Sequence, residues 1–207
     1  MGAAVRPAAP GAAGEKEIVP ARSIVYNNKK RGRAGRAGQP PQGESAMNTK
    51  RTDYINWNEY FMGIAALTAM RSKDPNSQVG ACIVSPENKI LSLGYNGMPI
   101  GCSDDEMPWG REGAPLDTKY MYVCHAELNA ILNSAHNNLK GARVYVTMFP
   151  CNECAKAIIQ SGIAEIVYRD DKYPGSDSSI ASRHMFKLAG VKVTRYEPSG
   201  REICFSL

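Results

Sequence analysis

The sequence predicts an α/β fold in which helices flank one central sheet of about five strands. Two observations lead to this expectation. Hydrophobic residues recur first at helical and then at strand spacing, giving the order helix, strand, strand, helix, strand, helix, strand, helix, strand. The length of 207 residues, with 43% hydrophobic and 22% charged residues, suits one ordinary globular domain.

The first three elements are a helix and a hairpin. Residues 53–72 form the predicted helix, because their large apolar side chains recur at helical spacing. The turn-forming run Asp74-Pro75-Asn76 ends it. The apolar runs 79–84 and 90–95 are separated only by Ser85-Pro86-Glu87-Asn88, which predicts two antiparallel strands joined by a turn.

A long loop follows, at about residues 96–122, with several Gly and Pro residues. Loops of this length inside a compact domain are usually functional. Beyond it, helices and strands are predicted to alternate, with Gly162 and Gly190 ending two of the helices. These elements span residues 125–137, 144–147, 151–161, 163–168, 180–188 and 191–196.

Residues 1–47 are predicted to be a disordered basic extension, and residues 48–207 the folded domain. The extension is rich in Ala, Gly, Pro and Arg, which bury too little apolar surface to offset the entropy of ordering. It holds eight basic and three acidic residues, so it carries the whole formal net charge of +5. The remainder of the chain is neutral, which does not favour nucleic-acid binding. No run approaches ~20 apolar residues, so no membrane association is expected. We expect a cytoplasmic protein, with organelle targeting by the extension left open.

Three residues have the spacing and chemistry of zinc ligands. Cys151 and Cys154 lie three residues apart at the start of a predicted helix, so both sulfurs can face one ion. His125 opens another predicted helix. One imidazole and two thiolates leave the fourth zinc position open for water, as in catalytic sites. The alternative is a structural site with Cys124 as fourth ligand, although Cys124 and His125 cannot easily both bind from one helix start.

Glu127 is the predicted catalytic residue. It lies two positions after His125, so in the first turn of that helix it can reach water at the metal without binding the metal. A carboxylate there can take up and return a proton. The pair of motifs, H-x-E and P-C-x-x-C, is the known signature of zinc-dependent nucleobase deaminases.

With these residues placed, the chain resembles the cytidine deaminase superfamily and, within it, the dCMP deaminases. The resemblance spans about residues 53–196 and rests on four runs: Gln78–Val84, Gly94–Pro99, His125–Ala130 and Pro150–Lys156. It implies a three-layer α/β/α fold with a mixed, about five-stranded sheet. It also implies an enzyme that uses zinc to hydrolyse dCMP to dUMP and ammonia, supplying dUMP for thymidylate synthesis. In that reaction Glu127 would move the protons.

The resemblance also implies substrate contacts. The Ala126 N–H would bind the pyrimidine oxygen, Asn96 would reach sugar or base, and Tyr173 would stack on the base. For the phosphate, Asn76 stands where many relatives carry Arg, so Arg71, Lys73 and Asn76 all remain candidates. Relatives of this type are homohexamers regulated by dCTP, and by dTTP with Mg²⁺. A regulatory site near residues 96–106 would include the acidic run Asp104-Asp105-Glu106.

Two other functions stay open at this stage. A deaminase of RNA or single-stranded DNA could use the basic extension as an anchor, although the folded part has no excess of positive charge. A zinc-stabilised interaction module would need no catalytic carboxylate, so substitution of Glu127 separates it from the enzymes.

Overall fold

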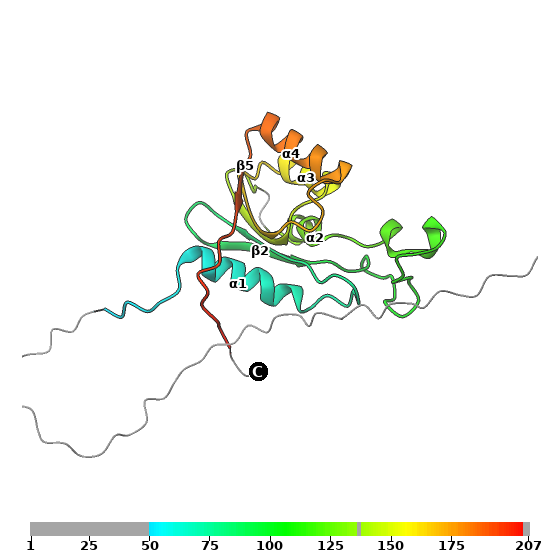
Figure 1. The fold of residues 1–207 in the computed structure, drawn as a ribbon, viewed down its shortest axis with the longest axis horizontal. Coiled ribbons are helices and arrows are strands. Elements are labelled where there is room, and N and C mark those ends of the chain that lie inside the picture. Colours follow the sequence, from blue (N-terminus) through cyan, green and yellow to red (C-terminus); the bar gives the residue numbers. More distant parts are fainter. Residues whose placement is uncertain (1–49, 136–137, 205–207) are drawn as a thin grey trace, which may run out of the picture. The chain divides into compact units, whose positions relative to one another are not determined.

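The computed structural model describes residues 50–135 and 138–204; the predicted extension, residues 1–47, lies outside them. The described residues up to Ser199 form one compact unit, and the described residues 200–204, which belong to a separate unit, contain no helix or strand. The unit contains four α-helices and five strands (Figure 1). They are α1 (Trp57–Ala69), β1 (Gly80–Val84), β2 (Ile90–Tyr95), α2 (Ala126–Leu132), β3 (Arg143–Met148), α3 (Asn152–Gln160), β4 (Glu165–Asp170), α4 (Asp177–Ala189) and β5 (Lys192–Arg195).

The strands form one mixed sheet in the order β2-β1-β3-β4-β5. The predicted hairpin is confirmed: β1 and β2 are antiparallel, with Cys82 opposite Leu93. β1 is also antiparallel to β3, whereas β3, β4 and β5 run parallel, as strands joined by crossover helices do. The mixed five-stranded sheet of the predicted fold class is therefore present.

Alternate residues of the central strands face opposite layers. Cys82 and Val84 of β1 pack with Phe61 and Ala65 of α1. Ala81 and Ile83 face the other way, into a cluster that includes residues of α2, α3 and α4. Figure 1 shows the same division, with α1 on one side of the sheet and the other helices across it. This period-two burial makes three layers and confirms the α/β/α prediction.

Helix boundaries differ from the predicted ones where capping residues decide them. α1 begins at Trp57 because Asn56 and Glu59 form a reciprocal capping box. α4 begins before the predicted residue 180, because the Ser176 hydroxyl accepts from the Ser179 N–H. The prediction of a helix to residue 137 is wrong, since α2 ends at Leu132. Asn133 and Ser134 follow, and both residue types favour helix ends over helix interiors.

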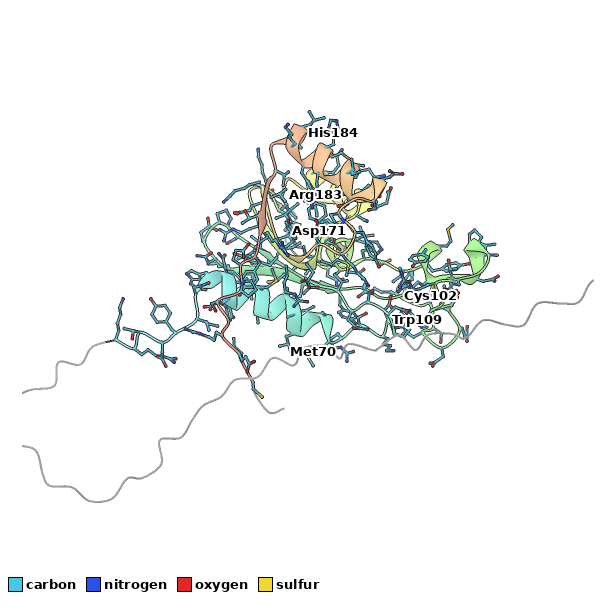
Figure 2. The ribbon with its side chains drawn as sticks, viewed as in Figure 1. Met70, Cys102, Trp109, Asp171, Arg183 and His184 are labelled. Atoms are coloured by element: carbon cyan, nitrogen blue, oxygen red, sulfur yellow. The ribbon has the colours of Figure 1, made fainter. Side chains whose placement is uncertain are left out.

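The long loop between β2 and α2 is more ordered than its composition suggests. It contains two short 3₁₀ turns, at Pro115–Asp117 and Lys119–Met121. Its ends are closed by a bridge in which Gly97 and Cys124 exchange backbone hydrogen bonds of 3.0 and 2.9 Å. The Trp109 indole donates to the Asp104 carbonyl at 2.8 Å, within the part of the loop where Figure 2 labels Cys102 and Trp109.

None of the helices in the described part of the chain has the length and apolar character required to cross a membrane.

Replacing Gly80 with alanine should lower the free energy of unfolding by about 3 kcal/mol. A Cβ at Gly80 would lie 2.0 Å from the Ala65 carbonyl oxygen and 2.5 Å from the Ala69 nitrogen, so α1 could not keep its place on β1. Urea unfolding measures the change. Gly63→Ala is the matched control: a Cβ there meets nothing within 4 Å, and alanine favours the helix by about 0.5–1 kcal/mol. Equal stability of Gly80→Ala and the wild type would contradict this packing.

Candidate active site

Two helix starts place the predicted zinc ligands together. His125 is the residue immediately before α2, and Cys151 the residue immediately before α3, where its sulfur accepts from the Cys154 N–H at 3.5 Å. Cys154, in the first turn of α3, turns its sulfur to the same point. Free N–H groups and the helix dipole favour anionic ligands such as thiolates at these positions.

The three ligand atoms have the spacing of a tetrahedral zinc site. His125 Nδ1 lies 3.3 Å from Cys151 Sγ and 3.5 Å from Cys154 Sγ, and all three atoms lie within 4.8 Å of one another. Zinc bonds of about 2.0 Å to nitrogen and 2.3 Å to sulfur, at the tetrahedral angle, require nitrogen–sulfur separations of about 3.6 Å. Among the described residues, no other His, Cys, Asp or Glu group has this compactness. The donor set and its geometry therefore fit Zn²⁺.

The electrostatics of the group also favour a cation. A hydrogen bond from Cys154, with a further one from His125, lowers the pKa of the Cys151 thiol to about 4. The pKa of the Cys154 thiol is raised, first by sharing a proton with Cys151 and then by burial. The hydrogen bond to Cys151 raises the pKa of His125 to about 9. Two sulfurs and one imidazole thus share protons that a metal displaces on binding.

Glu127 lies beside these ligands in a buried position. Glu127 is 4% exposed, and its carboxylate interacts with His125, Cys151 and the Cys154 thiol. Burial raises the pKa of Glu127, while His125 acts in the opposite direction. A carboxyl group with a raised pKa can both take up and release a proton near neutral pH.

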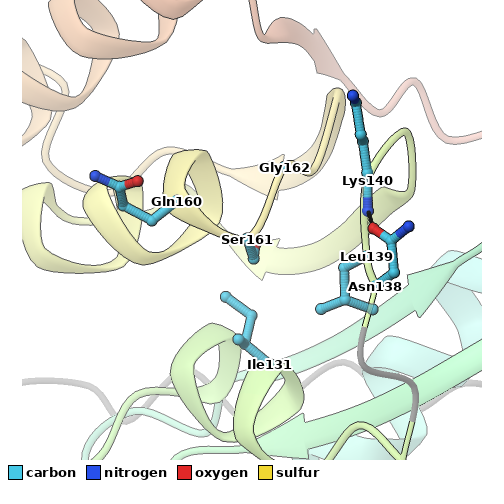
Figure 3. Close-up of a pocket in the computed structure, with 7 residues that line it drawn as sticks. All are labelled: Ile131, Asn138, Leu139, Lys140, Gln160, Ser161 and Gly162. Atoms are coloured by element: carbon cyan, nitrogen blue, oxygen red, sulfur yellow. Dashed lines mark hydrogen bonds between the residues drawn. The ribbon is translucent and has the colours of Figure 1, made fainter.

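A cavity of about 330 Å³ opens onto Glu127 and the ligands His125 and Cys151. Its walls include the apolar side chains of Val79, Val123 and Phe149. A larger cavity of about 550 Å³ lies elsewhere, between Ile131 and the segments 138–140 and 160–162 (Figure 3). Lys140 is the one charged residue among the described residues that line this larger cavity. The smaller cavity, with its titratable groups, is therefore the candidate active site.

A buried polar network forms one wall of the active-site cavity. Asp74 and Lys119, only 2% and 5% exposed, form an ion pair. Asp74 Oδ1 accepts from the backbone N–H groups of Asn76 and Ser77, at 2.8 and 3.1 Å. The Asn96 amide donates to Asp74 Oδ2 and to the Ser77 carbonyl, and its oxygen accepts from the Val79 N–H at 2.8 Å. These bonds hold Asn96 in one orientation at the cavity wall.

The predicted substrate-contact residues separate into two groups. Ala126, Asn96 and Tyr173 all line the cavity that holds Glu127. Asn76 does not; its backbone supports Asp74 instead. The other phosphate candidates also lie off the cavity wall: Lys73 pairs with Asp104, and the Arg71 guanidinium lies 6.0 Å from the centre of the Tyr95 ring.

Sequence reasoning missed many residues of the cavity, among them Arg111, Lys119, Lys172 and Ser179. Arg111 and Lys119 come from the long loop, and Lys172 and Ser179 from the region around the start of α4. For Arg111 and Lys119, the only signal in the sequence was their position in a loop already predicted to be functional. Lys172 and Ser179 are recognisable as cavity residues only once the chain is folded.

The start of α4 is fixed against the start of α3. The Ser182 hydroxyl donates to the Pro150 carbonyl at 3.0 Å, and Ser178 exchanges hydrogen bonds with Asn152. The Arg183 guanidinium lies 4.0 Å from the centre of the Phe149 ring and forms an ion pair with Asp171. Figure 2 labels Arg183 and Asp171. These contacts hold the cavity wall formed by α4 next to Cys151.

Replacing Lys119 with methionine should lower the free energy of unfolding by about 3 kcal/mol, because the buried Asp74 carboxyl group would lose its cationic partner. Chemical denaturation measures the loss. Lys73→Met removes an ion pair whose lysine side chain is 64% exposed, so this control should leave stability unchanged. If both variants were equally stable, the buried pair would have no role in holding the cavity wall.

Comparison with known proteins matches the same part of the chain. Residues 55–170 match a family model described as the cytidine and deoxycytidylate deaminase zinc-binding region. Deoxycytidylate deaminase from Homo sapiens is 59% identical over 155 residues, which cover 74% of this chain and 87% of the human protein. The Pongo abelii deoxycytidylate deaminase matches with the same identity and coverage.

A solved structure has the same fold. The dCMP deaminase from the cyanophage S-TIM5, in complex with dCMP and dUMP, superposes with a TM-score of 0.52 at 27% identity. The match covers 67% of this chain and 95% of the phage protein.

Proposed function

The chain belongs to the cytidine and deoxycytidylate deaminase family, and from this premise we propose that it is a zinc-dependent enzyme that hydrolyses dCMP to dUMP and ammonia. The observation that carries the proposal is the compact His125–Cys151–Cys154 group with the buried Glu127 carboxylate beside it. High identity to deoxycytidylate deaminases selects dCMP among the substrates of the family.

His125, Cys151 and Cys154 would hold the zinc. Zinc in a site with three protein ligands lowers the pKa of a water molecule to about 7, and so makes a nucleophile available at neutral pH. The N-terminal ends of α2 and α3 keep the three ligands in place. The hydrogen bonds of Ser178 and Ser182 support the turn that carries Cys151.

Glu127 would perform the proton transfers of the reaction. Its carboxylate would take one proton from the attacking water and deliver it to ring N3. It would then take the remaining proton from the oxygen added at C4 and deliver it to the amine, which leaves as ammonia while the C4 carbonyl forms. Both transfers need a carboxyl group whose pKa is above its usual range, and burial supplies that shift.

The cavity walls would hold the pyrimidine ring over Glu127. Ala126 is fully buried at the first position of α2, where a backbone N–H has no acceptor within its helix and can bind the pyrimidine oxygen. Asn96, held by Asp74, Ser77 and Val79, presents an oriented amide. Tyr173 is half exposed at the opening, where its ring can cover the base.

Release of ammonia from dCMP by the purified, zinc-loaded protein tests the proposal. We expect dCMP to be preferred over free cytidine, over guanine, and over the cytosine bases of RNA or single-stranded DNA. A chain lacking residues 1–46 should retain this activity, because the residues that line the cavity lie between Asp74 and Ser179. No turnover of dCMP, with turnover of one of the other substrates, would contradict the assignment.

The proposal also covers several properties of the whole protein. We place the catalytic domain at residues 48–207, with residues 1–47 as an extension. A homo-oligomer, with a hexamer as the expected state, is supported by exposed apolar side chains on the edge strand β2 and at the two ends of α1, among them Leu93, Trp57 and the C-cap residue Met70. The described cysteines are all free of disulfides, which suits a reducing cytoplasm.

Regulation by dCTP, and by dTTP with Mg²⁺, remains a proposal that rests on family membership. The acidic run Asp104-Asp105-Glu106 lies in the long loop, where Asp104 pairs with Lys73. Residues 96–106 therefore stay the region proposed for an effector nucleotide.

A further inference from the structure

The proposed reaction leaves the buried ion pair of Asp74 and Lys119 without a role, although both residues line the active-site cavity. Both side chains are almost fully buried. Taking two charges out of water costs free energy that their attraction often fails to recover, so an apolar pair of similar size would often be no less stable. A buried ion pair at the wall of a cavity therefore points to a role besides stability.

The Asp74 carboxylate joins this ion pair to Asn96. Its Oδ1 accepts from the backbone N–H groups of Asn76 and Ser77, which fixes the carboxylate in the turn between α1 and β1. Its Oδ2 accepts from the Lys119 ammonium and, at 3.3 Å, from the Asn96 amide. Both groups at Oδ2 line the cavity. Asp74 thus sets the position of Asn96 relative to the long loop, which carries Lys119 in its second 3₁₀ turn.

The hydrogen bonds of Asn96 allow only one orientation of its side-chain amide. Both amide protons are used, one by Asp74 Oδ2 and one by the Ser77 carbonyl at 2.9 Å. The amide oxygen accepts from the Val79 N–H at 2.8 Å. A reversed amide would place its oxygen against two acceptors and its NH₂ group against a donor, so the three contacts exclude it. The Asn96 backbone is also held, because its carbonyl accepts from the Ser72 hydroxyl at 2.8 Å.

This orientation decides what Asn96 can offer to a ligand. A side-chain amide has two protons to donate and an oxygen that can accept two hydrogen bonds. In Asn96 both protons are committed within the protein, whereas the oxygen keeps the capacity for one further hydrogen bond. Asn96 is 5% exposed and lines the cavity. Its side chain can therefore meet a ligand only as an acceptor.

We propose that Asp74 and Lys119 are positioning residues, which hold the Asn96 amide so that it meets the substrate with its oxygen. The proposal rests on the proposed function and gives a part in that reaction to two residues that make none of its bond changes. Lys119 acts through Asp74: it supplies the opposite charge that a buried carboxylate requires, and the carboxylate orients the amide. An acceptor oriented in advance needs no reordering when the substrate binds.

Asp74→Asn tests this role at constant side-chain shape in the full-length, zinc-loaded protein. The new oxygen can still accept from the Asn76 and Ser77 N–H groups, but the new NH₂ group would face the protons of Asn96 and of the Lys119 ammonium. We expect kcat/KM for dCMP to fall roughly 10- to 100-fold. The fall should come mainly through KM, because a contact at the cavity wall is made in substrate and transition state alike.

A double-mutant cycle with Asn96→Ala separates positioning from a structural role. Asn96→Ala alone should lower kcat/KM for dCMP by a similar factor. If Asp74 acts through Asn96, adding Asp74→Asn to Asn96→Ala should cause little further loss, whereas two independent losses would multiply. Asp53→Asn is the matched control, because Asp53 is an exposed carboxylate that pairs with Arg51. It should behave as wild type.

Calorimetric binding of dUMP repeats the cycle without turnover, below the melting temperature of every variant. The losses of affinity should again be non-additive. Lys119→Met in place of Asp74→Asn should give the same pattern, so the test does not depend on the folding of one variant. Multiplying losses, or wild-type dUMP binding in Asp74→Asn or Lys119→Met, would overturn the positioning role. Failure of wild-type dCMP turnover with a non-additive dUMP cycle would instead count against the proposed function alone.

Discussion

Replacing Glu127 with glutamine should reduce turnover of dCMP by on the order of 10⁴-fold while the protein keeps its zinc and its fold. Glutamine has nearly the same shape as glutamate, so the cavity should remain packed. It cannot accept or return a proton at neutral pH, and both transfers in the reaction would lose their carrier. The interactions of Glu127 with His125 and the two cysteines place that carrier beside the metal ligands.

Steady-state ammonia release and zinc content, measured on the same preparation, check this expectation. Glu153→Gln is the matched control, because Glu153 also lies in the first turn of a helix next to a zinc ligand but is exposed and pairs with Lys156. It should keep wild-type turnover. Substantial activity in Glu127→Gln would show that another group moves the protons, and loss of zinc would show that Glu127 serves the metal instead.

Removing a zinc ligand should have an effect of similar size for a different reason. Cys151→Ala deletes the thiolate that interacts with both other ligands, so zinc should fall far below one per chain and dCMP turnover should be lost. Because zinc binds the folded state and not the unfolded state, it stabilises the folded protein. Loss of zinc should therefore also lower the melting temperature of Cys151→Ala. Treating the wild type with a chelator should produce the same losses, and zinc should restore them.

Cys124→Ser distinguishes a catalytic from a structural metal site. Cys124 is adjacent to His125, yet its backbone pairs with Gly97 and it lies outside the compact ligand group. We expect Cys124→Ser to retain one zinc per chain and full turnover. If it lost zinc as completely as Cys151→Ala, the site would have four protein ligands and no open position for chemistry.

The sequence predicted the centre of the site better than its edges, for a physical reason. His125, Glu127, Cys151 and Cys154 lie within short local motifs, where spacing alone places side chains on one helix turn. Arg111 and Lys172 meet the same tyrosine from segments about 60 residues apart, so only the fold brings them together. The same holds for Asp74 and Lys119, a pair 45 residues apart whose burial no local pattern shows.

The fold prediction failed mainly where one capping residue decides a boundary. Periodicity located each helix and strand, but α1 and α4 begin where Asn56 and Ser176 satisfy the first N–H groups. α2 ends at Leu132, although the predicted helix continued to about residue 137. Boundaries of this kind depend on single side-chain hydrogen bonds, which a periodic pattern does not contain.

X-ray absorption spectroscopy at the zinc edge of the purified full-length protein tests the central claim most directly. The account predicts one zinc per chain with two sulfur neighbours at about 2.3 Å and two lighter neighbours at about 2.0 Å, from His125 and a water molecule. Addition of dUMP should perturb this shell, since the open position faces the cavity that also contains Glu127. A shell of three or four sulfurs, or purified protein that binds no zinc, would contradict it.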